Sequence, residues 1–350
     1  MSILDKPQAL AATPSSKVRI VAALTARERA LFIEESLTAT GLNTPITFAA
    51  EGELSPDGWA RQLEAWQPEI LVTGWSTPPL PEAWLNRSDC PLRYVCHVAG
   101  SVRNLVPRRF IERGGLVTNW GERISGQVAE HGLLLALAAL RNQASWLPYI
   151  HRPLSGRQIT DLRTRTLFGL RVGLHGFGSV ARALLPLLQP FGVTVSAFSA
   201  GVPAAIFAQH GVRAMPSLGQ LFAESDVLFE CESLTPSTRG TVSAAVLAAL
   251  PDDAVFVNIG RGAVVDDAAL VQEGRSGRIR LALDVVSAEP LTPASPFVSV
   301  PGIVLSPHIG GPTLDRYADC GHHALANVAR VLDGAEPVGR IDLACYDRAT

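Results

Sequence analysis

The sequence predicts an α/β fold in which parallel strands alternate with helices. Three observations support this prediction: short apolar segments recur along the chain, segments with helical spacing separate them, and a glycine-rich turn joins one apolar segment to one helical segment. Strands buried on both faces are typical of parallel sheets, and their alternation with helices is typical of βαβ units. A chain of 350 residues, 47% of them hydrophobic, is long enough for two domains with separate cores.

The composition excludes several classes of protein. Lys and Arg number 30 against 32 Asp and Glu, so no net basic charge is available for nonspecific nucleic-acid binding, and we expect a small-molecule partner. The five cysteines are odd in number and lack CxxC spacing, which favours a reducing cytoplasm over a disulfide framework or a zinc site. The first sixteen residues indicate a loose tail rather than a signal peptide. The longest apolar run, 132–140, is about half of a membrane span, so no membrane partner is expected.

The apolar segments give the expected order of elements. The first group of strands is expected at 18–24, 46–50, 69–75, 92–100 and 116–119, with helices at 59–66 and 125–141. A polar segment, 149–166, indicates a surface connection. Beyond a strand that begins at Leu170, further strands are expected at 193–198, 226–232, 254–260, 279–285 and 303–308. Residues 313–332 are again helical in pattern, and Pro186 should kink or end the helix in which it falls.

The segment 170–200 has the pattern of a dinucleotide-binding βαβ unit. Gly176 and Gly178 allow a tight turn and a close approach of the backbone to a pyrophosphate, and Ala181 replaces the usual third glycine. The N-terminus of the following helix directs unpaired N–H groups at the phosphates. A purely structural turn is the alternative interpretation. His175, which precedes this turn, is interpreted as a packing residue on the strand.

Ligands of parallel sheets bind beyond the carboxyl ends of the strands, so the residues there are candidates for chemistry. Arg261 and Glu289 each follow a predicted strand, and His308 is the last residue of one. Reduction of a 2-oxo acid needs a cation that binds the carboxylate and an acid that protonates the carbonyl oxygen. The Arg261 guanidinium suits the first role, and the His308 imidazole suits the second because imidazole exchanges protons near neutral pH. A hydrogen bond from Glu289 to the imidazole would stabilise its protonated form and hold the ring.

Four motifs occur in an order that resembles the D-isomer-specific 2-hydroxyacid dehydrogenase family. They are the glycine turn from Gly176 to Ala181, VNIGRGAVVD at 257–266, LDVVSAEPL at 283–291 and SPHIGG at 306–311. The resemblance is close from Leu167 to Pro312 and looser over the first 120 residues. Residues 117–141 are also similar to the family's dimer and hinge segment, so the resemblance implies a homodimer.

The resemblance implies a Rossmann-type doubly wound parallel sheet domain at 121–308 that binds NAD. It also implies a flavodoxin-like α/β substrate domain at 1–120, to which 309–350 returns, with the active site in a cleft between the domains. Carried over by position, Arg261 binds substrate, His308 is the acid/base and Glu289 is its partner, with no metal. The resemblance also implies that backbone amides near Gly100 and Ser101 hold the substrate carboxylate. The expected cofactor contacts are Gly176, Phe177, Gly178, Ser179, Val180, Ser199, Cys231, Thr235, Ile259, Gly260, Asp284, His308 and Gly310, with Asp284 at the nicotinamide carboxamide.

The chain departs from the family pattern at several positions. Ser199 stands where users of NAD commonly place an acidic residue for the ribose 2′-hydroxyl, and no arginine follows before Arg213. NAD is therefore favoured, and NADP is left open. Cys231 and Ser233 replace a histidine and a proline of the family, and the loop AGSVRN at 99–104 brings in Arg103 as a second candidate ligand of the substrate carboxylate.

Two other functions are compatible with the same fold. A nucleotide-sensing regulatory or scaffold protein would keep the cofactor site without needing Arg261, Glu289 and His308 together. A relative that oxidises formate or phosphite would act on an anion with no carbonyl to protonate. The joint presence of the three side chains favours a 2-hydroxyacid dehydrogenase that moves a hydride between NAD(H) and a small 2-oxo or D-2-hydroxy acid.

Overall fold

The computed structural model describes residues 18–40, 42 and 44–348, so the predicted N-terminal tail lies outside the described residues. The chain divides into two compact units. Unit 1 comprises Met1–Arg123 and Leu314–Thr350, and unit 2 comprises Ile124–Thr313. The sequence placed its boundaries after residues 120 and 308, whereas the structure divides the chain after residues 123 and 313.

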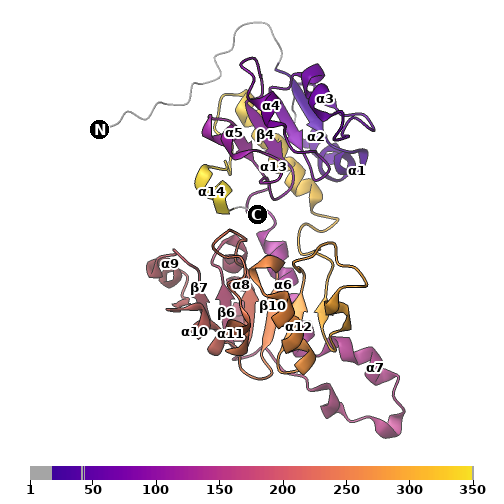
Figure 1. Ribbon diagram of the computed structural model, residues 1–350, viewed down its shortest axis with the longest axis vertical. Helices are drawn as coiled ribbons and strands as arrows, with labels where there is room; N and C mark the ends of the chain where they lie inside the picture. The colour runs from indigo at the N-terminus through magenta and orange to yellow at the C-terminus, as the bar shows by residue number, and fades with distance from the viewer. Residues whose placement is uncertain (1–17, 41, 43, 349–350) are drawn as a thin grey trace. The chain divides into compact units, whose positions relative to one another are not determined.

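Unit 1 contains a five-stranded parallel sheet in the order β2-β1-β3-β4-β5. This is the 2-1-3-4-5 order of flavodoxin-like folds, which confirms the predicted class. The strands are β1 Ile20–Ala23, β2 Ile46–Phe48, β3 Ile70–Thr73, β4 Tyr94–His97 and β5 Leu116–Thr118. The helices, visible in Figure 1, are α1 Ala26–Glu28, α2 Glu34–Thr40, α3 Trp59–Trp66, α4 Glu82–Leu85, α5 Arg108–Glu112, α13 Tyr317–Leu332 and α14 Leu343–Arg348, and a π-helical turn covers Arg29–Ile33.

Glu28, a member of the capping box of α1, also holds the loop that follows β3 in unit 1. The Thr25 hydroxyl and backbone amide both donate to the Glu28 carboxylate, each at 2.9 Å, as expected when Thr and Glu stand three residues apart at a helix start. The same carboxylate, on a side chain only 3% exposed, accepts from the Ser76 backbone amide at 2.8 Å. Because Glu28 is buried and fully bonded, the segment 74–77 is held rigidly at the carboxyl end of β3.

Unit 2 contains a seven-stranded parallel sheet in the order β12-β11-β10-β9-β6-β7-β8. This order is the Rossmann arrangement with one further strand, which confirms the doubly wound prediction. The strands are β6 Arg171–His175, β7 Thr194–Phe198, β8 Arg213–Ala214, β9 Val227–Glu230, β10 Val255–Asn258, β11 Arg280–Leu283 and β12 Val304–Leu305. The sequence did not predict β8, which has two exposed residues, and β12 is shorter than the strand expected at 303–308.

Helices cover both faces of the unit 2 sheet. On one face Leu184 and Leu188 of α8 pack with Leu174 and Phe229, and on the other Leu270 of α12 packs with Phe256. The first face carries α6 Ser125–Leu140, α8 Ser179–Leu188 and α9 Ala204–Gln209, and the second carries α10 Leu218–Ala223, α11 Ala244–Ala248 and α12 Asp267–Ser276. As expected, α8 ends soon after Pro186, at Leu188, where a 3-10 turn begins.

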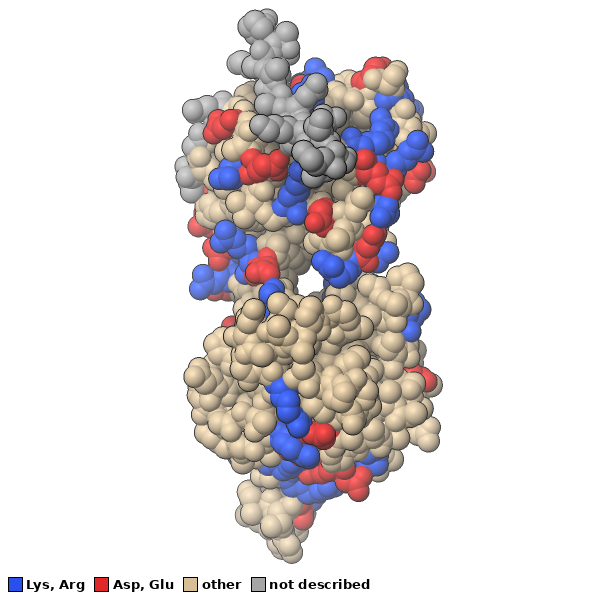
Figure 2. All heavy atoms as spheres, turned by 90° about the vertical axis from the view of Figure 1, so that its left-hand side faces the viewer, with Lys and Arg blue, Asp and Glu red and all other residues tan. Residues whose placement is uncertain are grey.

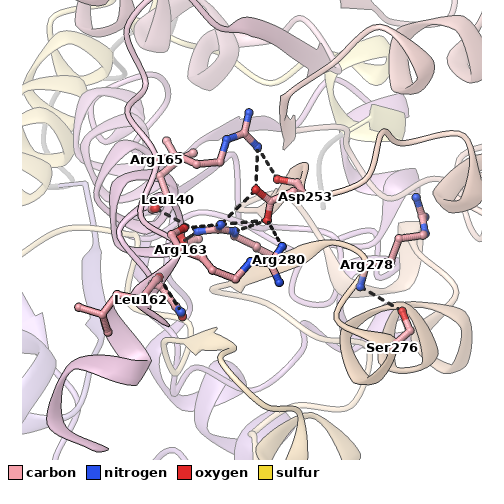
Figure 3. Close-up of polar contacts among 10 residues, drawn as sticks. Leu140, Leu162, Arg163, Arg165, Asp253, Ser276, Arg278 and Arg280 are labelled. Carbon is pink, nitrogen blue, oxygen red and sulfur yellow. Dashed lines mark hydrogen bonds and ion pairs between the residues drawn. The ribbon is translucent and has the colours of Figure 1, made fainter. Parts of the chain in front are cut away.

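The connection between α6 and β6 carries α7 Trp146–Ile150 and short 3-10 turns at Gln143–Ser145, Leu154–Gly156 and Ile159–Leu162. Arginine side chains attach its end to the sheet (Figure 3). The Arg280 guanidinium donates to the Asp253 carboxylate at 2.9 Å, to the Leu140 carbonyl at 3.0 Å and to the Arg163 carbonyl at 2.6 Å. Arg165 donates to the Asp253 carbonyl at 2.5 Å. This cluster lies at the amino ends of the strands, so it stabilises the unit at the edge opposite the expected ligand site.

Charge is mixed over the face of the molecule that Figure 2 draws. Among the described residues visible there, basic and acidic side chains are interspersed, and much of the drawn surface of unit 2 carries neither. Within the described part of the chain, every helix is too short or too polar to cross a membrane.

Candidate active site

The glycine turn after β6 is built so that only glycine fits at its first position. Gly176 has a φ of +85°, and a Cβ there would lie 2.7 Å from the Cα of Glu232. Gly178 caps the N-terminus of α8, where an added Cβ would meet nothing within 4 Å. The turn therefore leaves an open approach to the N-terminal amides of α8, which is what a pyrophosphate group requires.

The turn lies where the strand order reverses. β6 pairs with β7 on one side and with β9 on the other, so the segments after β6, β7 and β9 share one edge of the sheet. The predicted contacts Phe177, Ser179, Val180, Ser199, Cys231 and Thr235 all lie on these three segments. Burial raises the pKa of the Cys231 thiol well above its ordinary value, and the charges of Glu230 and Glu232 add to this effect. The Cys231 thiol is therefore protonated, as expected for an inert residue.

His175 differs from the packing residue that the sequence suggested, because it forms a buried ion pair. Its Nδ1 lies 2.5 Å from Oε2 of Glu230, and the two side chains are 3% and 0% exposed. Burial would lower the pKa of His175, but the adjacent Glu230 carboxylate outweighs this and raises it. The other Glu230 oxygen accepts from the backbone amide of Glu232 at 2.8 Å, so the pair fixes the segment that faces Gly176.

Ser199, which replaces the usual acidic residue after β7, is bonded to a carboxylate from another strand. Its hydroxyl donates to Oε2 of Glu232 at 2.9 Å, and Oε1 of Glu232 accepts from the Ser233 amide at 2.9 Å. Glu232 was not among the residues predicted from the sequence. Its position at the carboxyl end of the strand predicted at 226–232 was the signal that could have identified it.

Arg261 lies in a tight turn after β10. The buried Asn258 side chain accepts from the Gly260 amide at 3.1 Å, and the Arg261 guanidinium donates to the Gly260 carbonyl at 2.7 Å. A Cβ on Gly262 would lie 1.9 Å from the carbonyl carbon of Val286, so this turn packs directly against the segment that leads to Glu289. Burial lowers the pKa of Arg261 and the charge of Glu289 opposes the change, so an arginine at this position stays cationic.

Asp284 is the centre of a hydrogen-bond network at the end of β11. Its carboxylate accepts from the Ser306 hydroxyl at 2.6 Å and from the Ile309 and Gly310 amides at 2.9 Å. His131 of α6 lies 3.2 Å from the same carboxylate. Burial alone would raise the pKa of Asp284, but the hydrogen bonds outweigh it and lower the pKa to about 2. The ionised Asp284 thus fixes the loop that carries His308.

His308 and Glu289 form a hydrogen-bonded pair. Nδ1 of His308 lies 2.7 Å from Oε2 of Glu289, whose Oε1 accepts from the Val286 amide at 3.2 Å. The His308 backbone has a φ of +56°, a left-handed conformation that costs energy in a residue with a side chain. Its amide donates to the Asp284 carbonyl at 3.0 Å, and its side chain is 49% exposed. The ring is therefore oriented through Nδ1, and Nε2 is the nitrogen that this pairing does not use.

The remaining predicted residues, Gly100, Ser101 and Arg103, belong to unit 1, where they follow β4. The aromatic residues around this edge were not predicted. A Cβ on Gly100 would lie 2.7 Å from the Trp120 ring, which follows β5. Trp75, which follows β3 and is 52% exposed, makes edge contacts with Phe32 at 5.1 Å and with Tyr317 at 5.8 Å between ring centroids. The carboxyl edge of this sheet is therefore lined with rings.

A family model matches this chain over residues 133–310, and its description is D-isomer specific 2-hydroxyacid dehydrogenase, NAD binding domain. The matched span contains the glycine turn together with Arg261, Asp284, Glu289 and His308.

Two curated proteins illustrate the range of similar sequences. The D-3-phosphoglycerate dehydrogenase of Mycobacterium leprae is 32% identical over 244 residues, which cover 69% of this chain and 46% of that protein. The hydroxyphenylpyruvate reductase of Plectranthus scutellarioides is 33% identical over 207 residues, or 58% of this chain and 64% of that protein. The chain thus spans about half the length of the phosphoglycerate dehydrogenases that it matches.

Solved structures share the fold over nearly the whole chain. The TT0316 protein of Thermus thermophilus has a TM-score of 0.73 at 25% identity and covers 93% of this chain and 100% of its own. A D-lactate dehydrogenase of Treponema pallidum has a TM-score of 0.75 at 21% identity, with 93% and 100% coverage.

Proposed function

The chain belongs to the D-isomer-specific 2-hydroxyacid dehydrogenase family, and we propose that it transfers a hydride between NAD(H) and a small 2-oxo acid or D-2-hydroxy acid. The observation that carries this proposal is the pairing of His308 with Glu289 at 2.7 Å, beside a cationic Arg261 on the same edge of the sheet. The open glycine turn at Gly176 fits a dinucleotide.

Each side chain has one role in the proposed reaction. The nicotinamide, when bound, supplies or accepts the hydride at the substrate C2. The Arg261 guanidinium binds the carboxylate of the 2-oxo acid and polarises its carbonyl group. The backbone amides of Gly100 and Ser101, with the side chain of Arg103, contribute further hydrogen bonds to the carboxylate.

The orientation of the histidine ring determines which of its nitrogens transfers the proton. Because Nδ1 of His308 is bonded to Glu289, Nε2 is the nitrogen that gives its proton to the carbonyl oxygen as the hydride arrives at carbon. The product is the 2-hydroxy acid, and the ring is left neutral. In the reverse direction Nε2 takes the hydroxyl proton. Glu289 holds the ring through Nδ1 in both directions of the reaction.

The same pairing disfavours the two other functions. A regulatory or scaffold protein has no use for a histidine held by a carboxylate in a costly backbone conformation. Oxidation of formate or phosphite has no carbonyl oxygen for the Nε2 proton. An assay of several substrates distinguishes both alternatives from the proposed reaction.

The rings of unit 1 favour a substrate with an apolar or aromatic substituent. Trp75 is held at the carboxyl edge by its contacts with Phe32 and Tyr317, and its loop is fixed by Glu28. A phenyl group on C3 of a 2-oxo acid would gain edge contacts and apolar burial there, worth about 1 kcal/mol beyond area alone. We therefore place phenylpyruvate above glyoxylate.

We expect NADH-dependent reduction of phenylpyruvate, followed at 340 nm, with a kcat/KM at least about tenfold above that for glyoxylate or hydroxypyruvate. Formate and phosphite should give no NADH from NAD. Binding of NADH without turnover of any 2-oxo acid would support the regulatory alternative. Equal rates on glyoxylate and phenylpyruvate would remove the aromatic preference but not the reaction.

We also propose a homodimer that forms through unit 2. The segment 141–168 exposes large apolar side chains, among them Leu147 at 62%, Leu154 at 81% and Ile159 at 74%, and Leu134 of α6 is 59% exposed. Such side chains are expected to be buried against a second copy. Light scattering should give twice the mass of one chain, and the L147E/I159E double variant should give half that value. A monomeric wild-type protein would contradict the proposal.

We also propose a cytoplasmic location for the protein, because all five of its cysteines are free thiols. Detection of the protein in a cell fraction other than the cytoplasm would contradict it.

A further inference from the structure

A carboxylate occupies the corner between the glycine turn and the end of β7, although the residue at the end of β7 is a serine. We propose that Glu232, which follows β9, binds the hydroxyl groups of the adenosine ribose and thereby selects NAD over NADP. This inference rests on the proposed function only in so far as the protein binds a nicotinamide dinucleotide.

The position of Glu232 follows from three neighbouring strands. β6 lies between β7 and β9, so the residues that follow β7 and β9 flank the turn at Gly176. The Cα of Glu232 lies only 2.7 Å from the place where a Cβ of Gly176 would be. From there the side chain reaches the end of β7, where its Oε2 accepts from the Ser199 hydroxyl at 2.9 Å. The acidic residue that binds ribose in this fold commonly follows the second strand, so Glu232 places a carboxylate at an equivalent point.

The Glu232 carboxylate is held in place but retains capacity to accept. Ser199 donates to one oxygen and the Ser233 amide donates to the other. An ionised carboxylate accepts about four hydrogen bonds, so two acceptor positions are available for two ribose hydroxyl groups. The side chain is only partly buried, so a ligand can reach it. The Glu230 carboxylate, which is paired with buried His175, accepts from the backbone amide of Glu232. This bond fixes the backbone of Glu232 before a ligand binds, which lowers the entropic cost of ordering the site.

The residues at the end of β7 disfavour a 2′-phosphate. A phosphate would meet the negative charge of Glu232 directly. The connection from Ser199 to Val212 contains no lysine or arginine. The next arginine, Arg213, donates to the Ser196 hydroxyl at 3.2 Å and forms an ion pair with Glu224. The guanidinium of Arg213 is thus already bonded to two groups on its own side of the sheet.

The experiment measures dissociation constants of NADH and NADPH by quenching of tryptophan fluorescence and by calorimetry. The proteins are the wild type, E232Q and the control D252N. Asp252 is 89% exposed and precedes β10, at the opposite edge of the sheet, so D252N removes the same charge away from the ribose. Wild type and D252N should prefer NADH by at least about 100-fold. E232Q should bind NADH about tenfold more weakly and NADPH more tightly, because one charged hydrogen-bond acceptor is lost.

Three results would overturn the inference: a wild type that prefers NADPH, an E232Q variant with an unchanged NADH to NADPH ratio, and a D252N variant that changes the ratio equally. Failure of the wild type to bind either nucleotide would instead overturn the proposed function. If E232Q does not fold, E232D keeps the charge with a shorter reach. E232D should weaken NADH about tenfold while still rejecting NADPH. Comparison of ADP-ribose with 2′-phospho-ADP-ribose on the wild type then tests the ribose contact without the nicotinamide.

Discussion

Replacement of His308 by asparagine should lower kcat for 2-oxo acid reduction by about 10³-fold, while the dissociation constant of NADH stays within about twofold of the wild type. Asparagine can still donate a hydrogen bond, and it tolerates the left-handed backbone conformation that His308 adopts. It cannot give up a proton near neutral pH. The loss therefore isolates proton transfer from folding and from cofactor binding. Single-turnover reduction with preloaded NADH measures the step directly.

Two companion variants make the His308 result interpretable. H151N applies the same substitution to an exposed histidine on the connection after α7, and it should leave kcat unchanged. E289Q keeps a hydrogen-bond acceptor at the distance of 2.7 Å but removes the charge, so it should lower kcat by about tenfold only. An equal loss of NADH affinity and turnover in H308N would identify His308 as a structural residue.

Most of the fold could be predicted from the sequence because each strand is a compact apolar segment. The predicted strand segments contain the β-strands of both sheets except β8, which has only two exposed residues and hence no apolar pattern. The segment 303–308 was expected to be a strand because it begins with three apolar residues, whereas only Val304–Leu305 pair with β11. The loop conformation there is fixed by hydrogen bonds to Asp284, and such bonds leave no trace in hydropathy.

The candidate site was predictable where its residues follow strands that lie side by side in the sheet. Arg261 and Glu289 follow strands that pair directly, and the rule that ligands bind at carboxyl ends places them together. Two other contacts of the site were not predicted. His131 reaches Asp284 from α6, and Glu232 reaches Ser199 across β6. In both cases the two residues are far apart in the sequence, and the sequence pattern of their elements does not indicate the contact.

The aromatic edge of unit 1 was missed for a different reason. Trp75, Trp120 and Tyr317 are separated by long stretches of sequence, and each alone is an ordinary apolar residue. The sheet order and the return of α13 to unit 1 place the ring centroid of Trp75 at 5.8 Å from that of Tyr317 and at 6.3 Å from that of Trp120. The fold therefore bears on which substituent the substrate carries, whereas the motifs do not.

Replacement of Arg261 by lysine should reduce kcat/KM for a 2-oxo acid by about 10³-fold, with most of the loss in KM. Lysine keeps the positive charge, but its ammonium group cannot donate two parallel hydrogen bonds to a carboxylate as the planar guanidinium does. Its shorter reach also loses the bond to the Gly260 carbonyl, so the cation is held less firmly. Stopped-flow binding of oxamate, an unreactive carboxylate analogue, should weaken in parallel with KM.

The matched control for R261K is R275K, because Arg275 is an exposed residue of α12 whose guanidinium donates to the Ser299 hydroxyl at 2.9 Å. R275K should retain wild-type kinetics, which separates loss of the guanidinium from a general effect of the substitution. NADH affinity should be unaffected in both variants, since Arg261 is assigned to the substrate. A R261K variant that binds oxamate normally but loses NADH would show that Arg261 belongs to the cofactor site instead, and the assignment of the substrate carboxylate to the β10 turn would then be wrong.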